Sequence, residues 1–541
     1  MLFPLLLLLA APQQAMDHTL IQPIANMLGL ADSSALALAA LLGFIAAVLA
    51  AGLVRLLVLV ANNSYAFGLA TELSEEAYRK SLSQPYSVQL RRNSSIIIDS
   101  VMNKTMVVAG NVVAQILTLM TSVVVGLSIL IALIVTDPMV AAITGITFAL
   151  IYTAITFAVR QKLRHNGDTI ARESARAIKA LQEGMGGIRD VLIDGTQEIY
   201  AGIFRDADRP FKAAMSRNAI IAGSPRFIVE TFGMILIATV AFVLTRLDGG
   251  VGSAIPKLGV LALGAQRLLP MMQQSYAAIA TIRGSEASLR AVIDLLDQPA
   301  PPQQAAEQIG FNREIRLAEV DFQYPSATTP VLRKMDLTIP KGSRIGFYGP
   351  TGGGKSTTLD IIMGLLEPTS GRLQVDGVDI TERHQASWRR HVAHVPQAIY
   401  LSDSTIAENI AFGAKRDEID VDRLRSAAKS AQIADTIEGW PNGYDTMVGE
   451  RGLRISGGQR QRIGVARALY KMANLIILDE ATSALDNDTE SALIQAIEAL
   501  GPQVTIIMVA HRLSTLKNCD FLVEIEGGSV KRVGSYQDLI A

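Results

Sequence analysis

The chain has 541 residues, of which 50% are hydrophobic and 18% charged, and its formal net charge is −1. That length exceeds what one hydrophobic core supports, so at least two domains are expected. The near-neutral charge gives no reason to expect nucleic acid as a partner. The single cysteine, Cys519, rules out an internal disulfide and fits a reducing compartment.

Composition changes along the chain. Long apolar runs fill the part before about residue 285, whereas the sequence beyond residue 311 has ordinary soluble α/β character. Between them lies a stretch rich in Pro, Gln and Ala, which is typical of a linker. We therefore predict a helical transmembrane domain over 1–293, a linker over 294–311 and a soluble α/β domain over 312–541.

Five apolar stretches in the first domain are long enough to cross a membrane. A helix needs about 20 apolar residues to cross the hydrocarbon layer. A buried core helix would not explain runs of this length with so few charges. The predicted spans are 35–61, 106–135, 138–159, 227–245 and 254–281.

The distribution of Lys and Arg predicts how these spans are oriented. The loops 62–105 and 160–226 are rich in basic residues, whereas 12–34 has none and 246–257 has few. Basic loops stay in the cytoplasm. We therefore expect a multi-pass protein of the cytoplasmic (inner) membrane with its C-terminal domain in the cytoplasm. Helical extensions in the two basic loops would carry motion to the spans.

The start of the chain does not complete this pattern. Five spans that end in the cytoplasm would place 12–34 outside, yet 2–11 is apolar and too short to cross. No basic residues precede 2–11, so a signal peptide is disfavoured. We expect the tail of a first span whose beginning lies upstream. Residues 17–31 predict a short amphipathic helix, either a packing helix or a substrate-contacting one.

A glycine-rich phrase in the second domain predicts a phosphate-binding loop. It follows the apolar strand predicted over 345–348 and precedes a helix predicted over 357–366, the context that the motif needs. Its backbone N–H groups and the helix N-terminus would surround phosphates. Lys355 would reach the β- and γ-phosphates and Ser356 would hold Mg²⁺. The predicted nucleotide-binding residues here are Gly349, Thr351, Gly352, Gly353, Gly354, Lys355, Ser356 and Thr357.

Two acidic residues follow the aliphatic run 475–478, which predicts a fully buried strand. Asp479 at its end can hold the metal, and Glu480 can polarise an attacking water molecule. The alternative, two solvated loop acids, is disfavoured because a buried strand fixes where they emerge.

Between these motifs stands Ile455-Ser456-Gly457-Gly458-Gln459, which we call the signature phrase. With it, 312–541 resembles the nucleotide-binding domain of an ABC exporter. The resemblance implies that Ser456, Gly457, Gly458 and Gln459 cap the γ-phosphate bound by a second copy. The phrase 449–452 resembles the exporter segment that touches coupling helices. Isoleucine replaces the usual leucine at 455, which preserves volume.

The same resemblance assigns roles to four further residues. Tyr324 matches the aromatic side chain that stacks on adenine. Gln397 matches the glutamine that senses the γ-phosphate and contacts the metal. Asp486 matches the loop that crosses the dimer interface, and His511 matches the histidine that contacts the γ-phosphate. No catalytic position departs from the family pattern, so ATP and Mg²⁺ are expected, and a homodimer with two working sites is favoured over a heterodimer.

One membrane domain before one ATPase domain resembles a half-size exporter. Its membrane half is similar to lipid-linked oligosaccharide flippases of bacteria, which implies a polyprenyl-pyrophosphate-linked oligosaccharide or another amphipathic substrate. A multidrug or lipid exporter and a peptide exporter remain alternatives. The phrases that carry this resemblance are 93–95, 186–191, 224–230 and 267–270.

Three arginines are candidate substrate contacts, because arginine binds phosphate bidentately. Arg267 falls near the middle of its predicted span, where an ionisable residue is a functional candidate. Arg55 and Arg226 lie near cytoplasmic ends of spans, where snorkelling to the interface is the simpler interpretation.

Overall fold

The computed structural model describes residues 33–136, 138–247, 251–299, 307–325, 327–481, 487–498, 500–510 and 513–540. The chain separates into two compact units. The first comprises Met1–Ser83 and Arg92–Pro299, and the second comprises Gln84–Arg91 and Ala300–Ala541. The expectations for 2–11 and 17–31 lie outside the described residues.

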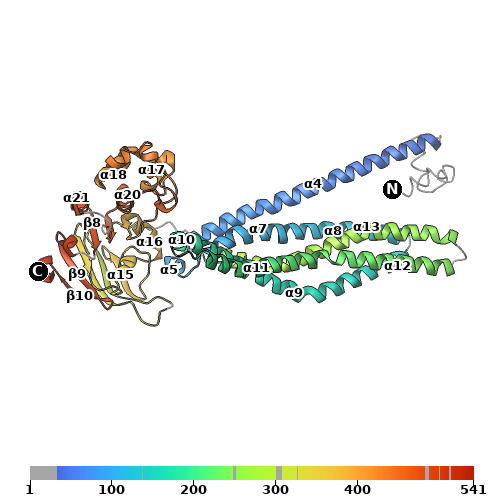
Figure 1. The fold of residues 1–541 in the computed structure, drawn as a ribbon, viewed down its shortest axis with the longest axis horizontal. Helices are drawn as coiled ribbons and strands as arrows, with labels where there is room; N and C mark the ends of the chain where they lie inside the picture. Colours follow the sequence, from blue (N-terminus) through green and yellow to red (C-terminus); the bar gives the residue numbers. More distant parts are fainter. Residues whose placement is uncertain are drawn as a thin grey trace. The chain divides into compact units, whose positions relative to one another are not determined.

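The described residues of the first unit form helices joined by short turns (Figure 1). Each of the five predicted spans lies within helical segments. The helices are α4 (Ser33–Leu82), α6 (Ser94–Ile98), π-helical η1 (Asp99–Lys104), α7 (Thr105–Val107), π-helical η2 (Val108–Val113), α8 (Ala114–Thr136), α9 (Pro138–Gly186), α10 (Ile188–Ile193), α11 (Gln197–Gly223), α12 (Pro225–Leu247), α13 (Val251–Gly284) and α14 (Glu286–Leu296).

Two helical stretches combine membrane-spanning length with very high hydropathy. Leu38–Leu82 and Ser94–Val135 contain windows of mean hydropathy 2.6 and 2.5, of which only 0% and 11% are buried. In water, such an outward-facing apolar surface would be unfavourable at about 25 cal/mol per Å². In lipid the same side chains are solvated, because the bilayer interior is itself hydrocarbon.

The helices α8, α9, α12 and α13 pack around a small core. Phe148 and Tyr152 of α9, Val229 of α12 and Leu268 of α13 are buried together. Gly264 lets α13 approach α8 closely, since a Cβ there would lie 2.7 Å from a Leu133 methyl group. Figure 1 shows α4 diverging from these helices toward its N-terminal end.

The helical extensions expected in the basic loops are present. The helix α4 continues to Leu82 and α9 to Gly186, well past the predicted spans. Their charged side chains form pairs four residues apart, such as Arg79 with Glu75 and Lys179 with Glu183. Such pairs stabilise an exposed helix by a few tenths of a kcal/mol each.

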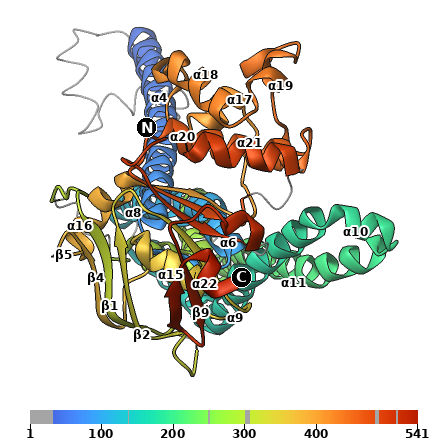
Figure 2. The ribbon, with the colours of Figure 1, turned by 90° about the vertical axis from the view of Figure 1, so that its left-hand side faces the viewer.

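The second unit contains two sheets (Figure 2). One is antiparallel, with strand order β2-β1-β4-β5, and the other is mainly parallel, with order β10-β9-β3-β8-β7-β6. The strands are β1 (Glu314–Phe322), β2 (Leu332–Pro340), β3 (Arg344–Tyr348), β4 (Ser370–Val375), β5 (Val378–Asp379), β6 (Val392–Val395), β7 (Leu475–Asp479), β8 (Thr505–Val509), β9 (Phe521–Glu526) and β10 (Ser529–Gly534).

Helices and short 3₁₀ turns cover these sheets. The short helix α5 (Tyr86–Gln89) belongs to the same unit. The other elements are α15 (Lys355–Ile362), α16 (Glu382–Trp388), η3 (Arg389–His391), α17 (Ile406–Ile410), η4 (Arg416–Glu418), α18 (Val421–Ser430), α19 (Ala434–Glu438), η5 (Gly443–Asp445), η6 (Glu450–Gly452), α20 (Gly457–Tyr470), α21 (Asn487–Glu498), η7 (Leu513–Leu516) and α22 (Tyr536–Ile540).

The larger sheet lies between two hydrophobic cores, which explains the continuous apolar sequence of its central strands. In β7, Leu475 and Ile477 belong to one core, whereas Ile476 and Leu478 belong to the other. Successive side chains of a strand point to opposite faces, so a strand covered on both faces must be apolar at every position. The prediction of a buried strand before Asp479 is confirmed.

Candidate functional site

The phosphate-loop phrase forms the turn between β3 and α15, as predicted. Gly353 N donates to Pro350 O at 3.1 Å within the turn, and Gly528 N donates to Gly353 O at 3.0 Å from outside it. The helix α15 begins at Lys355, so its unpaired first N–H groups face the loop. This end of a helix attracts anions.

Two glycines are required by the shape of this loop. Gly349 has φ +142° and Gly354 has φ +104°, both in the region that favours glycine. A Cβ on Gly349 would lie 2.1 Å from Ile525 O, and one on Gly354 would lie 2.7 Å from a Leu332 methyl group. Any side chain at either position would therefore displace the loop.

Two further predicted residues, Lys355 and Tyr324, make hydrogen bonds at the loop and at the first turn of α15. Lys355 Nζ donates to Gly349 O and to Pro350 O, each at 2.9 Å. The Tyr324 hydroxyl and Thr357 Oγ1 share a hydrogen bond of 3.3 Å. The ammonium group therefore lies beside the loop that would surround a phosphate, and the aromatic ring lies beside the first turn of α15.

The acidic residues emerge at the carboxyl end of the parallel sheet. Asp479 is the last residue of β7, paired with Val509 of β8. Glu480 follows at φ +52°, with its N–H bonded to Val509 O at 2.9 Å. Gln397 Nε2 donates to Glu480 Oε2 at 2.6 Å. The structure thus joins two residues that the sequence places 83 positions apart.

Asp360 is a charged neighbour of this site that the sequence motifs did not reveal. It lies on α15, four residues after Ser356 and therefore on the same helical face. Burial and, second, the negative charge of Asp479 raise the pKa of Asp360 to about 6. The spacing of four residues from Ser356 could have indicated that Asp360 lies near the site. The phosphate-loop pattern, however, does not include this position.

The signature phrase has a separate position in the same unit. Ser456 caps the N-terminus of α20, accepting from Gln459 N at 3.2 Å, while Gln459 Oε1 accepts from Ser456 N at 2.8 Å. Figure 2 shows α20 among α17, α18 and α19, whereas α15 lies beside the strands. Gly457 and Gly458 are the first two residues of α20, directly after the capping Ser456.

His511 and Asp486 lie outside the described residues. The strand that precedes His511, β8, runs between β3 and β7 and ends at Val509. The carboxyl end of β8 therefore falls between the phosphate loop and Asp479, at the edge where ligands of open α/β sheets bind.

The three candidate arginines lie on three helices of the first unit. Arg226 donates to Glu230 Oε1 at 3.0 Å on α12. Arg55 on α4 and Arg267 on α13 are both exposed, and Arg267 directly precedes the buried Leu268. Within the described part of the chain, no two of these three arginines contact each other. Their predicted contact with substrate stays a prediction.

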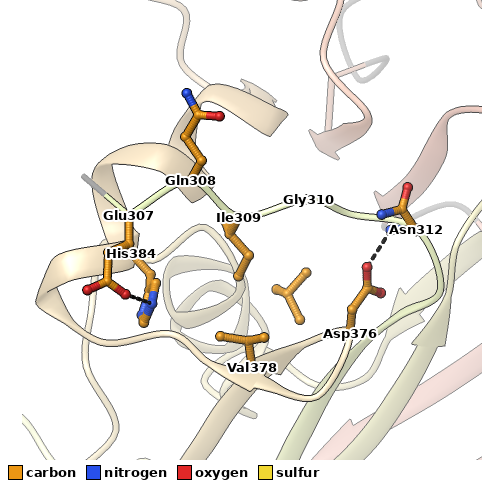
Figure 3. A pocket seen from close by; sticks show the side chains of 9 residues that line it. Glu307, Gln308, Ile309, Gly310, Asn312, Asp376, Val378 and His384 are labelled. Atoms are coloured by element: carbon orange, nitrogen blue, oxygen red, sulfur yellow. Dashed lines mark hydrogen bonds and ion pairs between the residues drawn. The ribbon is translucent and has the colours of Figure 1, made fainter. Parts of the chain in front are cut away.

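A cavity of about 310 Å³ lies elsewhere in the second unit (Figure 3). Its charged side chains have partners: His384 Nε2 is 3.1 Å from Glu307 Oε2, and Asp376 accepts from the backbone N–H of Asn312 at 2.6 Å. Since none of the predicted ATP-site residues lines it, we do not include it in the site. The lining residues are Glu307, Gln308, Ile309, Gly310, Asn312, Val375, Asp376, Val378 and His384.

The residues present fit a nucleotide with its metal. Ser356 and Asp479 offer the oxygen ligands that Mg²⁺ prefers, and Gln397 offers an amide oxygen. Gly349 and Gly354 let the loop backbone lie closer to its neighbours than a residue with a side chain would allow. The donor set and the loop therefore match a triphosphate better than an uncharged ligand.

Comparison with known proteins gives the same assignment for both units. Residues 332–483 match the ABC transporter family model, and 5–254 match the model of the ABC transporter transmembrane region. Together the two matches cover most of the chain and place its N-terminal half in a membrane.

Sequence relatives and a solved structure agree. An ATP-dependent lipid A-core flippase of Ralstonia nicotianae is 28% identical, with 86% of this chain and 79% of that protein covered. One from Chromobacterium violaceum is 33% identical over 72% of this chain and 67% of that protein. A bacterial Atm1-family ABC exporter, solved with ATP bound, matches with TM-score 0.83 and 25% identity over 99% of this chain and 93% of that one.

The phosphate loop, the acidic strand end and the signature phrase all lie in the domain that matches the ABC ATPase model, and a helical membrane domain precedes them. The order of the two domains, one of each, is that of a half-size exporter. The chain therefore belongs to the ABC transporter family, as an exporter half-transporter that binds ATP and couples its hydrolysis to transport across a membrane.

Proposed function

We propose that the chain is a flippase for a glycolipid in the cytoplasmic membrane, and that its substrate is a polyprenyl-pyrophosphate-linked oligosaccharide. The observation that carries the proposal is Arg267, an exposed cation at the middle of the apolar helix α13. A cation at that depth is costly unless it serves a function. A pyrophosphate group offers the bidentate partner that a guanidinium prefers.

A second candidate is a glycolipid of the lipid A-core type. The relatives from Ralstonia nicotianae and Chromobacterium violaceum are named lipid A-core flippases. Both candidate substrates join sugars to an apolar anchor, and such an anchor would suit the exposed apolar surface of a helix such as α4.

The ATP site supports specific roles for its residues. Lys355 would neutralise the β- and γ-phosphates, and Glu480, held by Gln397, would orient and polarise the attacking water. Ser356, Asp479 and Gln397 would hold Mg²⁺. When bound, Mg²⁺ supplies positive charge that offsets the charge of the phosphates. Tyr324 would stack on adenine, and His511 would contact the γ-phosphate.

We also propose that the protein is a homodimer whose ATP sites each combine two chains. In one chain the phosphate loop precedes the N-terminus of α15 beside the strands. Ser456 precedes the N-terminus of α20, which lies among the neighbouring helices. A second copy would bring its Ser456, Gly457, Gly458 and Gln459, with the loop around Asp486, to the phosphates. The membrane domain would bind lipid and substrate, and the ATPase domain would lie in the cytoplasm of a multi-pass inner-membrane protein.

A mixed dimer tests this arrangement. Lys355→Ala disables a phosphate loop and Ser456→Arg disables a signature, so either homodimer should be inactive. When differently tagged copies are co-expressed, each mixed dimer keeps one intact site. About a quarter of wild-type ATPase activity should return, because about half of randomly formed dimers are mixed. Activity that stays at the level of the single variants would contradict a shared site.

Reconstitution in liposomes tests the substrate. A fluorescent polyprenyl-pyrophosphate oligosaccharide and a lipid A-core analogue would be supplied separately, with Glu480→Gln as the inactive control. We expect ATP-dependent flipping of the first by the wild type alone. Flipping of the lipid A-core analogue alone would replace our substrate with the second candidate. ATP hydrolysis without flipping of either would refute the glycolipid proposal and leave the exporter assignment intact.

A further inference from the structure

A buried ion pair in the first unit joins residues five apart, whereas side chains three or four apart are the neighbours on an α-helix. Lys104 Nζ lies 3.3 Å from Asp99 Oδ2, and the two side chains are only 9% and 0% exposed. Five residues correspond to about 140° around an α-helix, which would point the two side chains in different directions. Other pairs on neighbouring helices, such as Lys179 with Glu183, join residues four apart.

The backbone explains the spacing. Asp99–Lys104 is the π-helical segment η1, in which hydrogen bonds close over five residues instead of four. A second π-helical segment, η2, follows after the short α7. The π-helical geometry brings positions 99 and 104 to one side, so the ion pair and this helical register depend on each other. π-Helical segments are rare and are frequently found at functional sites.

The pair lies where several helices meet. Ser174 of α9 donates to Asp99 Oδ1 at 2.6 Å, and Ser74 Oγ of α4 donates to Thr105 Oγ1 at 2.9 Å. Val101 packs against Leu295 of α14, the last helix of this unit before the ATPase domain in the sequence. Asp99 Oδ2 accepts no hydrogen bond within the described part of the chain, so the Lys104 ammonium is what balances its buried charge.

We propose that residues 99–113 form a register switch in the transport cycle, held in the π-helical register by the Asp99–Lys104 pair. A change of this stretch to α-helix separates the two charges and turns α6 by about 100° relative to α8 for each residue of register. The helix α8 itself is fixed by α13, since Ser122 Oγ donates to Gln274 Oε1 at 3.1 Å. The turn therefore appears upstream, at α6. The proposed switch rests on the exporter activity and not on the identity of the transported lipid.

The structure offers a direct readout of this turn. Ser95 on α6 is 1% exposed, whereas Ile96 and Ile98 beside it are exposed. A turn of α6 would bring Ser95 out of its buried position. Ser81 on α4, 3% exposed and near the same junction, serves as the reference, because it becomes accessible only if the junction itself unfolds. The single cysteine, Cys519, is removed by substitution to serine so that each probe is the only thiol.

The experiment measures maleimide labelling rates of Ser95→Cys and Ser81→Cys in the full-length protein in nanodiscs. With the charges neutralised by Asp99→Asn and Lys104→Met, we expect Ser95→Cys to label at least several-fold faster while Ser81→Cys is unchanged. The reversed pair, Asp99→Lys with Lys104→Asp, should restore slow labelling. Neutralising the exposed Lys179–Glu183 pair by Lys179→Met and Glu183→Gln is the matched control and should change neither rate.

Addition of ATP and vanadate tests whether the transport cycle uses the switch. We expect faster labelling of Ser95→Cys with the native Asp99–Lys104 pair and no change at Ser81→Cys. Unchanged labelling of Ser95→Cys after neutralisation would show that the pair does not hold the register. A parallel rise at both probes would show that the pair only stabilises the junction. No response to ATP and vanadate would show a static feature, and each of these results overturns the proposal.

Discussion

The two units of the chain bury their apolar side chains in opposite ways. In the ATPase unit, Phe347, Ile477 and Ile507 have no exposed surface, and the sheet lies between two continuous cores. In the membrane unit, Leu49 and Leu57 of α4 are more than half exposed. The first arrangement excludes water, whereas the second uses lipid as its solvent.

This difference decides where function can be read from the sequence. A sheet with two cores fixes its strand ends closely, so short motifs at those ends, such as the residues around Asp479 and Lys355, meet in one place. Long helices with outward-facing apolar surfaces fix their side chains less closely. Arg55, Arg226 and Arg267 accordingly lie on separate helices without a common contact in the described structure.

The largest effect is expected in the ATPase unit. Glu480→Gln removes the carboxylate that would polarise the attacking water, so ATP hydrolysis should fall by about 10²–10⁴-fold. ATP binding should survive, because the phosphate loop is untouched. Phosphate release and binding of a fluorescent ATP analogue measure the two effects separately. Retention of more than a tenth of the hydrolysis would assign the role of Glu480 to another residue.

A change at Arg267 should separate the two units. Arg267→Ala should reduce glycolipid flipping by at least about tenfold, the equivalent of one charge-assisted contact, while basal ATPase activity persists. Arg226→Ala is the matched control, because Arg226 is already paired with Glu230. The liposome assay measures both. Equal losses in the two variants would contradict a role in transport that is specific to Arg267.

Stability should respond differently in the two units. Ile477→Ala leaves a cavity in the covered sheet and should lower the free energy of unfolding by about 2–4 kcal/mol. Leu57→Ala on the exposed face of α4 should change it by less than about 1 kcal/mol. Thermal unfolding in the same detergent measures both. A larger loss at Leu57 would show that this face packs against protein and not lipid.

The smallest effect concerns Asp360, whose pKa in the folded protein is raised from 3.8 to about 6. The folded state therefore holds this proton more tightly than the unfolded state. Ionisation of the Asp360 carboxyl lowers the free energy of unfolding by its full amount above pH 6 and hardly at all below pH 4. Asp360→Asn should stabilise the protein by about 1 kcal/mol at pH 7.5, a figure reduced for its partial exposure.

The gain in stability from Asp360→Asn should become smaller as the pH falls from 6 to 4, because the wild-type carboxyl is then protonated in the folded protein. Melting temperatures in Mg²⁺-free buffer at pH 7.5 and 4.5 measure the difference. A gain of equal size at both pH values would assign the effect to packing instead of charge.

Much of the architecture could be predicted from the sequence, for local physical reasons. The apolar runs now seen within α4 and α8 are too long and apolar for a soluble domain, and the run 475–478 predicts a strand covered on both faces. The phosphate loop could be placed because its glycines and Lys355 act within a few residues of one another. These features depend on length, periodicity and neighbours in the chain.

Only the tertiary structure decided which distant groups meet. Gln397 and Glu480 are joined because β6 and β7 are neighbours in the sheet, and Asp360 lies within reach of Asp479 because α15 packs beside those strands. The Asp99–Lys104 pair lies within one helix, yet its spacing matched no helical pattern. It became possible only when neighbouring helices buried both charges and the backbone adopted a π-helical register. Sequence patterns encode local geometry, whereas contacts between segments depend on how the whole chain packs.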